Sequence, residues 1–253
     1  MNRLSRTKEI IAYITENQEV KLSDIADYFE VSVMTIRRDL INLENQGFLT
    51  VHRGKAVLNA GTSLELSPSL KGSQMAKDKK RIAKEAVKYI TEGSTIFLDC
   101  GTTLSELAFE VSEMKNVTVV TNSLLVVNTL CNFSNIKLLV LPGAFHEKSM
   151  GFLDVSTYVY LQNLHVDIAF LGAESVSSDL GFMVPDMNDG ECKRQLCACC
   201  KKVVVLADSS KIGRESMYKY ADFDGIDVFI TDNKCKSEDL EKMKKKSALV
   251  LTV

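Results

Sequence analysis

With 253 residues, of which 45% are hydrophobic and 25% are charged, the chain has the composition of a folded globular protein, and a core of this size needs no disulfide or metal to stabilise it. Its 31 basic and 33 acidic residues leave a net charge of −2, so the charge total does not indicate a polyanionic partner. No stretch approaches the roughly 18 consecutive apolar residues of a membrane span, and no signal-type apolar segment follows the first residues, so we expect a cytoplasmic protein without a membrane partner.

The first part of the chain shows the pattern of three short helices. Apolar residues at helical spacing predict one helix over residues 7–17, with Val20 continuing its apolar face. A second amphipathic run covers residues 22–29, with Ser23 as its capping candidate. After it, Ser32 is placed to cap a third helix. We therefore expect a compact unit of three helices.

The third helix is expected to begin with polar side chains and to end at Gly47. Its first two turns carry polar and basic side chains, where a recognition helix presents such groups to base edges and phosphates. An arginine guanidinium can bind guanine or a phosphate through two hydrogen bonds. Two short predicted strands, 48–51 and 56–58, flank a basic tip that would form a wing. On pattern alone, a protein-interaction module with a solvated basic face remains the alternative.

The residues from Val31 to Gly47 resemble the helix-turn-helix signature of the DeoR family of bacterial transcription regulators. This resemblance implies that residues 1–58 form a winged helix-turn-helix domain that binds double-stranded operator DNA. It also implies that Asp39 orients or pairs with an arginine. The position of Lys55, where the family usually has glycine, puts the shape of the wing in question. The implied DNA-contacting residues are Ser32, Thr35, Arg37, Arg38, His52, Arg53 and Lys55.

A linker is predicted at residues 59–74, where glycine, serine and proline are frequent and the apolar pattern is weak. The larger domain, 75–253, alternates short apolar runs with amphipathic helices. This alternation predicts an α/β fold with a mainly parallel sheet and helices on its faces. Strands are expected at 94–99, 117–121, 137–141, 166–172, 202–207 and 227–231.

The loops after these strands are rich in glycine, serine, threonine, aspartate and asparagine. Ligands of an open parallel sheet bind beyond the carboxyl ends of its strands. Gly101 permits close backbone approach, Thr102 and Thr103 supply hydroxyls at a helix amino end, and Lys211 adds a positive charge, which together suit a phosphate. Each loop taken alone is equally compatible with a capped strand-to-helix turn. The side chains that suit sugar hydroxyls are those of Asp99, Thr121, Asn122 and Asp208.

The same loops resemble successive blocks of the DeoR-type effector domain, so the likeness covers nearly the whole chain. That domain has a fold shared with ribose-5-phosphate isomerase and glucosamine-6-phosphate deaminase, and family members respond to phosphorylated sugars or sugar alcohols. The resemblance therefore implies a repressor of a sugar or sugar-alcohol operon whose DNA binding is modulated by such a ligand. The loop at Gly143 departs from the usual Gly-Gly, which puts its contacts in question. The implied effector-binding residues are Asp99, Gly101, Thr102, Thr103, Thr121, Asn122, Gly143, Gly172, Glu191, Lys193, Asp208 and Lys211.

Two recognition helices on one face of DNA lie about 34 Å apart, so we expect at least a homodimer, joined through the larger domain. The alternative function is a sugar-phosphate isomerase-like enzyme with an accessory helical domain, and a protein-protein adaptor is a third. The acid-base groups of such an enzyme would be Glu191, Asp99, Asp208 and Lys211. We favour the regulator, because a catalyst gains nothing from a recognition helix that carries Arg37 and Arg38.

Seven cysteines cannot all pair within one chain, and four of them lie on one predicted helix, namely Cys192, Cys197, Cys199 and Cys200. Reduced thiols buried on a packed helix are the expectation. A zinc-type spacing is present there, but no second pair and no histidine cluster accompanies it. We therefore expect no metal, no cofactor and no catalytic residue. The lysines at 242–246 are expected on a solvated helix face, with no assigned role.

Overall fold

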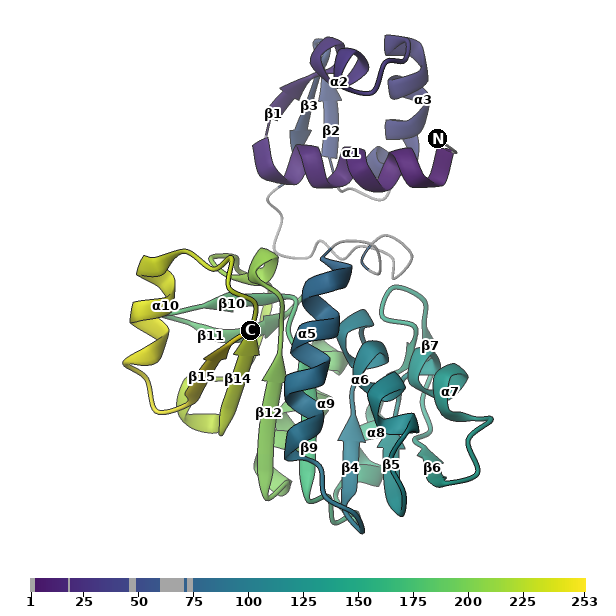
Figure 1. The fold of residues 1–253 in the computed structure, drawn as a ribbon, viewed down its shortest axis with the longest axis vertical. Coiled ribbons are helices and arrows are strands. Elements are labelled where there is room, and N and C mark those ends of the chain that lie inside the picture. Colours follow the sequence, from purple (N-terminus) through teal and green to yellow (C-terminus); the bar gives the residue numbers. More distant parts are fainter. Residues whose placement is uncertain (1–2, 18, 46–48, 60–70, 72–74) are drawn as a thin grey trace. The chain divides into compact units, whose positions relative to one another are not determined.

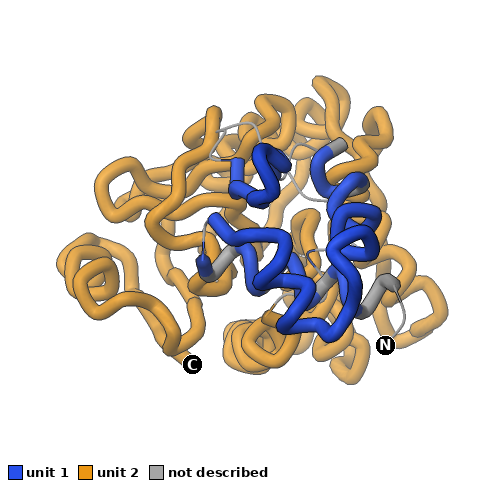
Figure 2. The backbone as a smooth tube through the Cα atoms, turned by 90° about the horizontal axis from the view of Figure 1, so that it is seen from above, with its two compact units in different colours: residues 1–74 blue, residues 75–253 orange. Residues whose placement is uncertain are grey.

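The computed structural model describes residues 3–17, 19–45, 49–59, 71 and 75–253. The chain divides into two compact units, residues 1–74 and residues 75–253, which Figure 2 distinguishes by colour. Gly47 and most of the predicted linker at 59–74 lie outside the described residues. None of the described helices is both long and apolar enough to cross a membrane.

The described residues of the first unit up to position 59 form three helices and a three-stranded antiparallel sheet (Figure 1). The apolar residues of the first and third helices, spaced three or four apart, face each other in one buried cluster, as the predicted periodicity requires. The sheet has the strand order β1-β3-β2. The elements are α1 (Arg3–Asn17), β1 (Glu19–Lys21), α2 (Leu22–Tyr28), α3 (Val33–Asn45), β2 (Leu49–His52) and β3 (Lys55–Leu58).

Two local expectations for this unit are wrong. Val20 lies on β1, where it pairs with Ala56 of β3, and not on the first helix. A strand of three residues is too short to show an alternating pattern against the helical spacing that precedes it. Ser23 does not cap the second helix, because α2 already begins at Leu22, and the Ser23 hydroxyl binds the Asp24 carboxylate instead.

A seven-stranded parallel sheet forms the centre of the second unit, which confirms the predicted α/β class (Figure 1). Six of its strands were predicted within one or two residues. The seventh, β15, pairs with β14 at one edge and falls in the carboxyl-terminal stretch for which no strand was predicted. In spatial order the strands are β15 (Leu249–Thr252), β14 (Val228–Thr231), β12 (Lys202–Leu206), β9 (Ile168–Gly172), β4 (Thr95–Leu98), β5 (Val117–Thr121) and β6 (Ile136–Val140).

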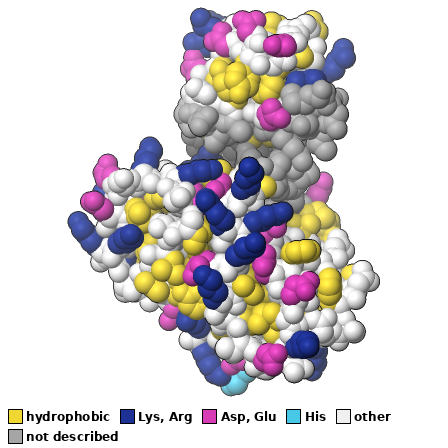
Figure 3. Space-filling view, viewed as in Figure 1, with side chains coloured by type: hydrophobic (Ala, Val, Ile, Leu, Met, Phe, Trp, Pro, Cys, Tyr) yellow, Lys and Arg dark blue, Asp and Glu magenta, His cyan; other side chains and the backbone are white. Residues whose placement is uncertain are grey.

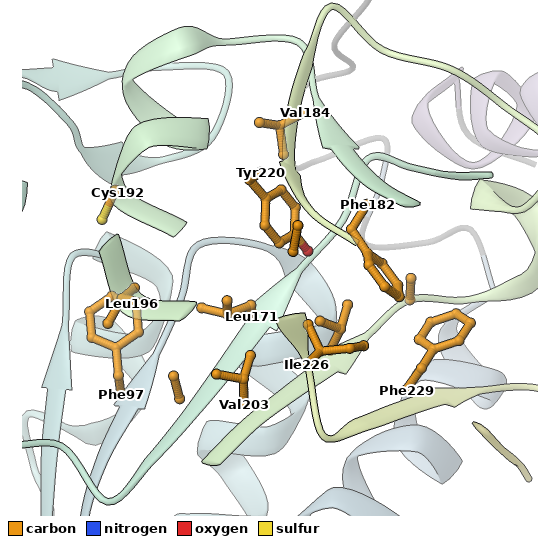
Figure 4. Packing of buried hydrophobic residues seen from close by; sticks show 14 of the residues in the cluster. Phe97, Leu171, Phe182, Val184, Cys192, Leu196, Val203, Tyr220, Ile226 and Phe229 are labelled. Atoms are coloured by element: carbon orange, nitrogen blue, oxygen red, sulfur yellow. The ribbon is translucent and has the colours of Figure 1, made fainter. Parts of the chain in front are cut away.

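Helices cover both faces of this sheet, because alternate side chains of each strand point to opposite faces. Ile96 and Leu98 of β4 pack with α5, α6 and α7, whereas Phe97 packs with α8, α9 and α10 on the other face. Figure 4 shows Cys192 and Leu196 of α9 lying over Phe97. The helices are α5 (Ala76–Ala86), α6 (Thr102–Ser112), α7 (Leu124–Leu130), α8 (Val155–Leu161), α9 (Met187–Cys199) and α10 (Ser237–Lys244).

Two small antiparallel sheets were not predicted. In the larger one, Phe182 packs on Phe223 and Phe229, with ring centroids 4.7 Å and 5.3 Å apart (Figure 4). This sheet therefore shares the core on the α9 face, and its Tyr220 hydroxyl donates a hydrogen bond to the Gly172 carbonyl at 3.0 Å. The strands are β10 (Ser175–Ser177), β11 (Gly181–Val184) and β13 (Tyr218–Ala221), and the second sheet is the hairpin β7 (Phe145–His146) with β8 (Gly151–Phe152).

Candidate functional site

The exposed face of α3 carries the predicted DNA-contacting arginines. Ile36, Leu40 and Leu43 are fully buried, which leaves Arg37 and Arg38 on the exposed side of the helix. The predicted amino-terminal cap is confirmed, because the Thr35 amide donates a hydrogen bond to Ser32 Oγ at 3.2 Å and the two hydroxyls lie 2.9 Å apart.

Two apolar side chains on this face were missed by sequence reasoning. Met34 and Ile41 are 66% and 50% exposed, and they lie three or four residues from the arginines on the same side of α3. Exposed apolar groups on such a helix can contact the methyl group of thymine. The sequence offered one signal for their exposure: neither residue falls at the helical spacing of Ile36, Leu40 and Leu43, which form the buried face.

Asp39 lies on the buried side of α3, and 2% of it is exposed. Its carboxylate accepts a hydrogen bond from Arg6 Nε of α1 at 2.7 Å. Asp39 therefore pairs with an arginine, as expected, and this ion pair ties the recognition helix to α1.

The wing between β2 and β3 is a tight two-residue turn. Arg53 and Gly54 have φ of 48° and 75°, as a hairpin turn of this type requires. His52 and Lys55 pair with each other at the ends of the two strands, so the lysine begins β3 without disturbing the turn. Both side chains and that of Arg53 are exposed, and the Lys55 ammonium binds the carboxylate of Glu19 on β1.

In the second unit, the loops predicted to bind the effector meet at one edge of the sheet. The strands β12, β9, β4, β5 and β6 are adjacent and parallel, so their carboxyl ends lie side by side. The loops at this edge contain Asp208 and Lys211 after β12, Gly172 at the end of β9, residues 99–103 after β4, Thr121 and Asn122 at the end of β5, and Gly143 after β6.

A buried lysine lies at the centre of this edge. The Nζ atom of Lys193 is 2.6 Å from Asp99 Oδ2 and 2.5 Å from Asp189 Oδ1, and only 2% of the lysine side chain is exposed. Asp99 also accepts a hydrogen bond from the Gly172 amide at 2.8 Å. Burial acts to lower the pKa of Lys193, but the attraction of Asp189 and Asp99 outweighs it and raises the pKa well above its usual value. The lysine therefore stays charged.

Two buried oxygen atoms at this edge, Asp99 Oδ1 and Asn122 Oδ1, accept no hydrogen bond from the described residues. Two neighbouring donors already bind other acceptors. The Thr121 hydroxyl donates to the Leu98 carbonyl at 2.6 Å, and Asn122 Nδ2 donates to the Phe152 carbonyl at 3.5 Å. Buried acceptors in proteins nearly always have a donor. Both residues are fully buried, so a ligand would reach these two atoms only if the surrounding loops opened.

The helix α6 begins at this edge without a side-chain cap from the described residues. Gly101 at its amino end has φ of 128° and ψ of 158°, a conformation that favours glycine. Thr102 follows at the first helical position and is partly exposed, whereas Thr103 is 7% exposed. Amide groups of the first turn of a helix bind anions readily, and a phosphate is the anion that this end suits.

Lys211 and Asp208 each interact with an oppositely charged side chain of this protein. Lys211 Nζ lies 2.7 Å from Glu174 Oε1, and both side chains are mostly buried. Asp208 is 2% exposed, accepts hydrogen bonds from Ser210, and has Lys79 Nζ of α5 at 3.8 Å. Neither Glu174 nor Lys79 was singled out in the sequence, because each lies far along the chain from its partner.

Glu191 lies on α9 with its carboxylate held by three neighbours. Arg194 donates at 2.6 Å, Gln195 at 3.0 Å and the Tyr218 hydroxyl at 3.0 Å. These hydrogen bonds, that of Arg194 above all, lower the pKa of Glu191 to about 2. The carboxylate is therefore ionised at neutral pH.

Gly143 is held by packing after β6. A Cβ atom there would lie 2.5 Å from Thr157 Oγ1 of α8, closer than side chains approach. The amide of the next residue, Ala144, donates to Asp154 Oδ2 at 2.8 Å. This loop is bound to the start of α8.

The expectation of buried cysteines on α9 holds for Cys192 alone. Cys192 is 1% exposed, Cys197 and Cys200 are partly exposed, and Cys199 is exposed at the carboxyl end of the helix. A hydrogen bond from the Cys200 thiol lowers the pKa of Cys199 to about 7. Among the described residues, no group of three or more histidine, cysteine or acidic side chains could hold a metal ion.

We expect Cys199 to be alkylated by iodoacetamide with a rate whose midpoint in pH lies below the usual thiol value of about 8.5, because the thiolate is the reactive form. Peptide mass spectrometry of samples quenched at successive times measures the rate. Replacing Cys200 by alanine removes the donor and should move the midpoint upward, whereas Cys200→Ser keeps a donor. A wild-type midpoint near the usual thiol value of about 8.5 contradicts this assignment.

Both units match known family domains. Residues 6–62 match the DeoR-like helix-turn-helix domain, and residues 74–233 match the DeoR C terminal sensor domain. The chain is 30% identical over 250 residues to a "Putative aga operon transcriptional repressor" of Escherichia coli O157:H7, with 98% of this chain and 93% of that protein covered. It is 28% identical over 232 residues to the "Glycerol-3-phosphate regulon repressor" of Escherichia coli K12, with 92% of each covered.

Among solved structures, ribose 5-phosphate isomerase A from Methanocaldococcus jannaschii matches 55% of this chain and 55% of its own, with 24% identity and a TM-score of 0.40.

Proposed function

Because this chain belongs to the DeoR family of DNA-binding transcription regulators, we propose that it represses an operon of sugar or sugar-alcohol metabolism and that a phosphorylated sugar bound in the second unit modulates its DNA binding. We assign DNA binding to residues 1–58 and sensing to residues 75–253, with 59–74 as the linker. The protein acts in the cytoplasm, where operator DNA is found.

The DNA-binding surface is the exposed face of α3 together with the wing. Arg37 and Arg38 are placed to bind guanine edges or phosphates, and Met34 to contact thymine methyl groups. Arg53 at the exposed wing tip suits the phosphate backbone. Ser32 and Thr35 support the first turn of the helix and present hydroxyls beside it.

The observation that carries the sensor assignment is the pair of unsatisfied acceptors beside a buried lysine. Asp99 Oδ1 and Asn122 Oδ1 need donors, and hydroxyl groups of a sugar supply them when the loops that bury both residues open. The start of α6, which has no side-chain cap from the described residues, suits a phosphate on the same molecule. A phosphorylated polyol satisfies both requirements at one edge of the sheet.

The ligand acts by linkage: it binds one arrangement of paired sensor domains better, and that arrangement holds the two recognition helices at a spacing that DNA accepts poorly. A coupling of about 1–3 kcal/mol, typical of allosteric proteins, changes operator affinity about 5- to 150-fold. The arrangement requires at least two copies of the chain.

A sugar-phosphate isomerase is the function that we reject. Its candidate acid-base groups are held in separate ion pairs: Asp99 with Lys193, Lys211 with Glu174, and Glu191 with Arg194. A general base near neutral pH needs a pKa near that pH, whereas that of Glu191 is about 2. The relatives named above are also regulators.

The test is fluorescence anisotropy of the protein with DNA from upstream of its own and adjacent genes. Hexose 6-phosphates, hexosamine 6-phosphates and glycerol 3-phosphate are added in turn, with inorganic phosphate and the free sugars as controls. Nanomolar binding that one phosphorylated compound weakens is the expected result. Equal affinity for random DNA at several salt concentrations, together with turnover of a compound, would support the isomerase instead.

Alanine at Lys211 or at Thr103 should leave operator affinity unchanged and weaken the response to the sugar phosphate about tenfold or more, because both residues lie in the loops at the carboxyl edge of the sheet to which we assign the site. The ligand concentration for half-release of DNA measures the effect. Lys219→Ala is the matched control, since Lys219 is ion-paired to Asp222 at 2.7 Å on the surface. A normal response in both variants contradicts the proposed site.

A further inference from the structure

One end of the second unit is almost without charge. The segment 116–166 contains no charged residues other than Lys137, Glu147, Lys148 and Asp154, although a quarter of the whole chain is charged. It forms β5, α7, β6, β7, β8 and α8, and thus the end of the sheet at which β6 is the edge strand. Loss of charge distinguishes the core of a protein interface from ordinary solvated surface.

Large apolar side chains are exposed at this end. Val155 and Val159, one turn apart on α8, are 60% and 46% exposed, and neighbouring Tyr160 is 60% exposed. Leu139 of β6 is 41% exposed and Phe145 of β7 is 51% exposed. We call these five residues the β6-end patch.

The edge strand and α8 are connected at this end of the sheet. Leu139 pairs in register with Val120, which belongs to the core beneath α8 and α9, so Leu139 faces the side of the sheet that α8 covers. The Thr157 hydroxyl of α8 donates to the Pro142 carbonyl at 2.8 Å, two residues beyond β6. The strand edge and the exposed face of α8 are thereby held together.

The edge strand adds a second reason for a partner. In the sheet of the described residues β6 pairs with β5 on one side, and its other side has no neighbouring strand. Apart from Lys137, which is exposed and lies two residues from Leu139 on the same side of the strand, β6 is apolar, and an apolar edge strand is prone to unwanted pairing unless something covers it.

We propose that the β6-end patch is the surface on which a second copy of this chain docks. Interfaces between two copies of one chain are more apolar than the interfaces of transient partners, and their cores contain few charged residues. The patch meets that condition. The exposed side of α5, dark blue in Figure 3, does not, because it carries Lys77, Lys80, Arg81 and Lys84. The need for a second copy rests on the proposed function, which requires two recognition helices.

Lysine at both Val155 and Val159 tests the proposal in the full chain. Both side chains are exposed in the single chain, so the substitutions should leave its fold intact, which circular dichroism and thermal unfolding verify. Sedimentation velocity should show wild-type protein as a dimer or larger, and the variant with a dissociation constant at least about a hundredfold higher, because buried unpaired charges oppose docking. Leu249→Lys, at a 53% exposed position on the opposite edge strand, is the matched control and should associate normally.

Three results would overturn the proposal: a monomeric wild type at micromolar concentration, unchanged association of the lysine variant, or equal dissociation by Leu249→Lys. The anisotropy assay distinguishes failure of the docking proposal from failure of the proposed function. A lysine variant that remains dimeric while operator binding still responds to a sugar phosphate removes the patch as the interface but leaves the repressor intact.

Discussion

A variant with alanine at both Arg37 and Arg38 is expected to bind operator DNA at least about thirtyfold more weakly than the wild type. Each arginine that reads a base contributes about 1–3 kcal/mol, so their joint loss is about 2–6 kcal/mol. Both side chains are exposed on α3 while the opposite face is fully buried, so the change should leave the fold intact. Anisotropy titration of operator and random DNA measures it.

The two DNAs separate the roles of the arginines. Base contacts give a loss on operator that exceeds the loss on random DNA, whereas phosphate contacts give equal losses and reduce the salt slope by about two. The control is alanine at Lys244 and Lys245, which removes two charges from the solvated end of α10. Unchanged operator affinity in the arginine variant would instead favour a protein-interaction role for the first unit.

The parts of the fold that the sequence predicted are those set by local periodicity. In α3 the spacing of Ile36, Leu40 and Leu43 is enough to identify the buried face, and therefore the exposed arginines. In the second unit, short apolar runs between helices predict parallel strands, since such strands are buried on both faces. Strand β1 has three residues, and its single buried valine also fits the preceding helix.

The composition of the proposed sensor site was less predictable from the sequence, because residues that contact each other there are distant in the sequence. Lys193 and Asp99 are 94 residues apart and meet only because α9 packs over the carboxyl end of β4. Asp189 was missed although its spacing of four residues from Lys193 on one helix was a visible signal. Tyr220 and Glu174 lie on or beside the small sheet that no local pattern indicated.

Replacing Lys193 by methionine is expected to lower the free energy of unfolding of the second unit by about 3–5 kcal/mol. The carboxylates of Asp99 and Asp189 are buried against this ammonium, and its loss leaves buried negative charge without a counter-charge. Methionine keeps most of the side-chain length, so the cavity left behind is small. Urea unfolding followed by circular dichroism gives the difference.

Two comparisons show whether burial of the charge is the cause. Lys201 is bound to Asp167 at the same distance of 2.6 Å, but its side chain is 75% exposed, and Lys201→Met should lower the free energy of unfolding by less than about 1 kcal/mol.

The second comparison is the pH dependence. The raised pKa of Lys193 means that its stabilising contribution is complete below the pKa of an unfolded lysine, about 10.4, and is lost only as the pH rises through the higher folded value. The contribution of Lys193 to the difference between wild type and Lys193→Met should therefore stay constant from pH 6 to pH 9. Equal costs for the two lysines would show that the ammonium is not what stabilises this edge of the sheet, and the sensor site would need another source of its rigidity.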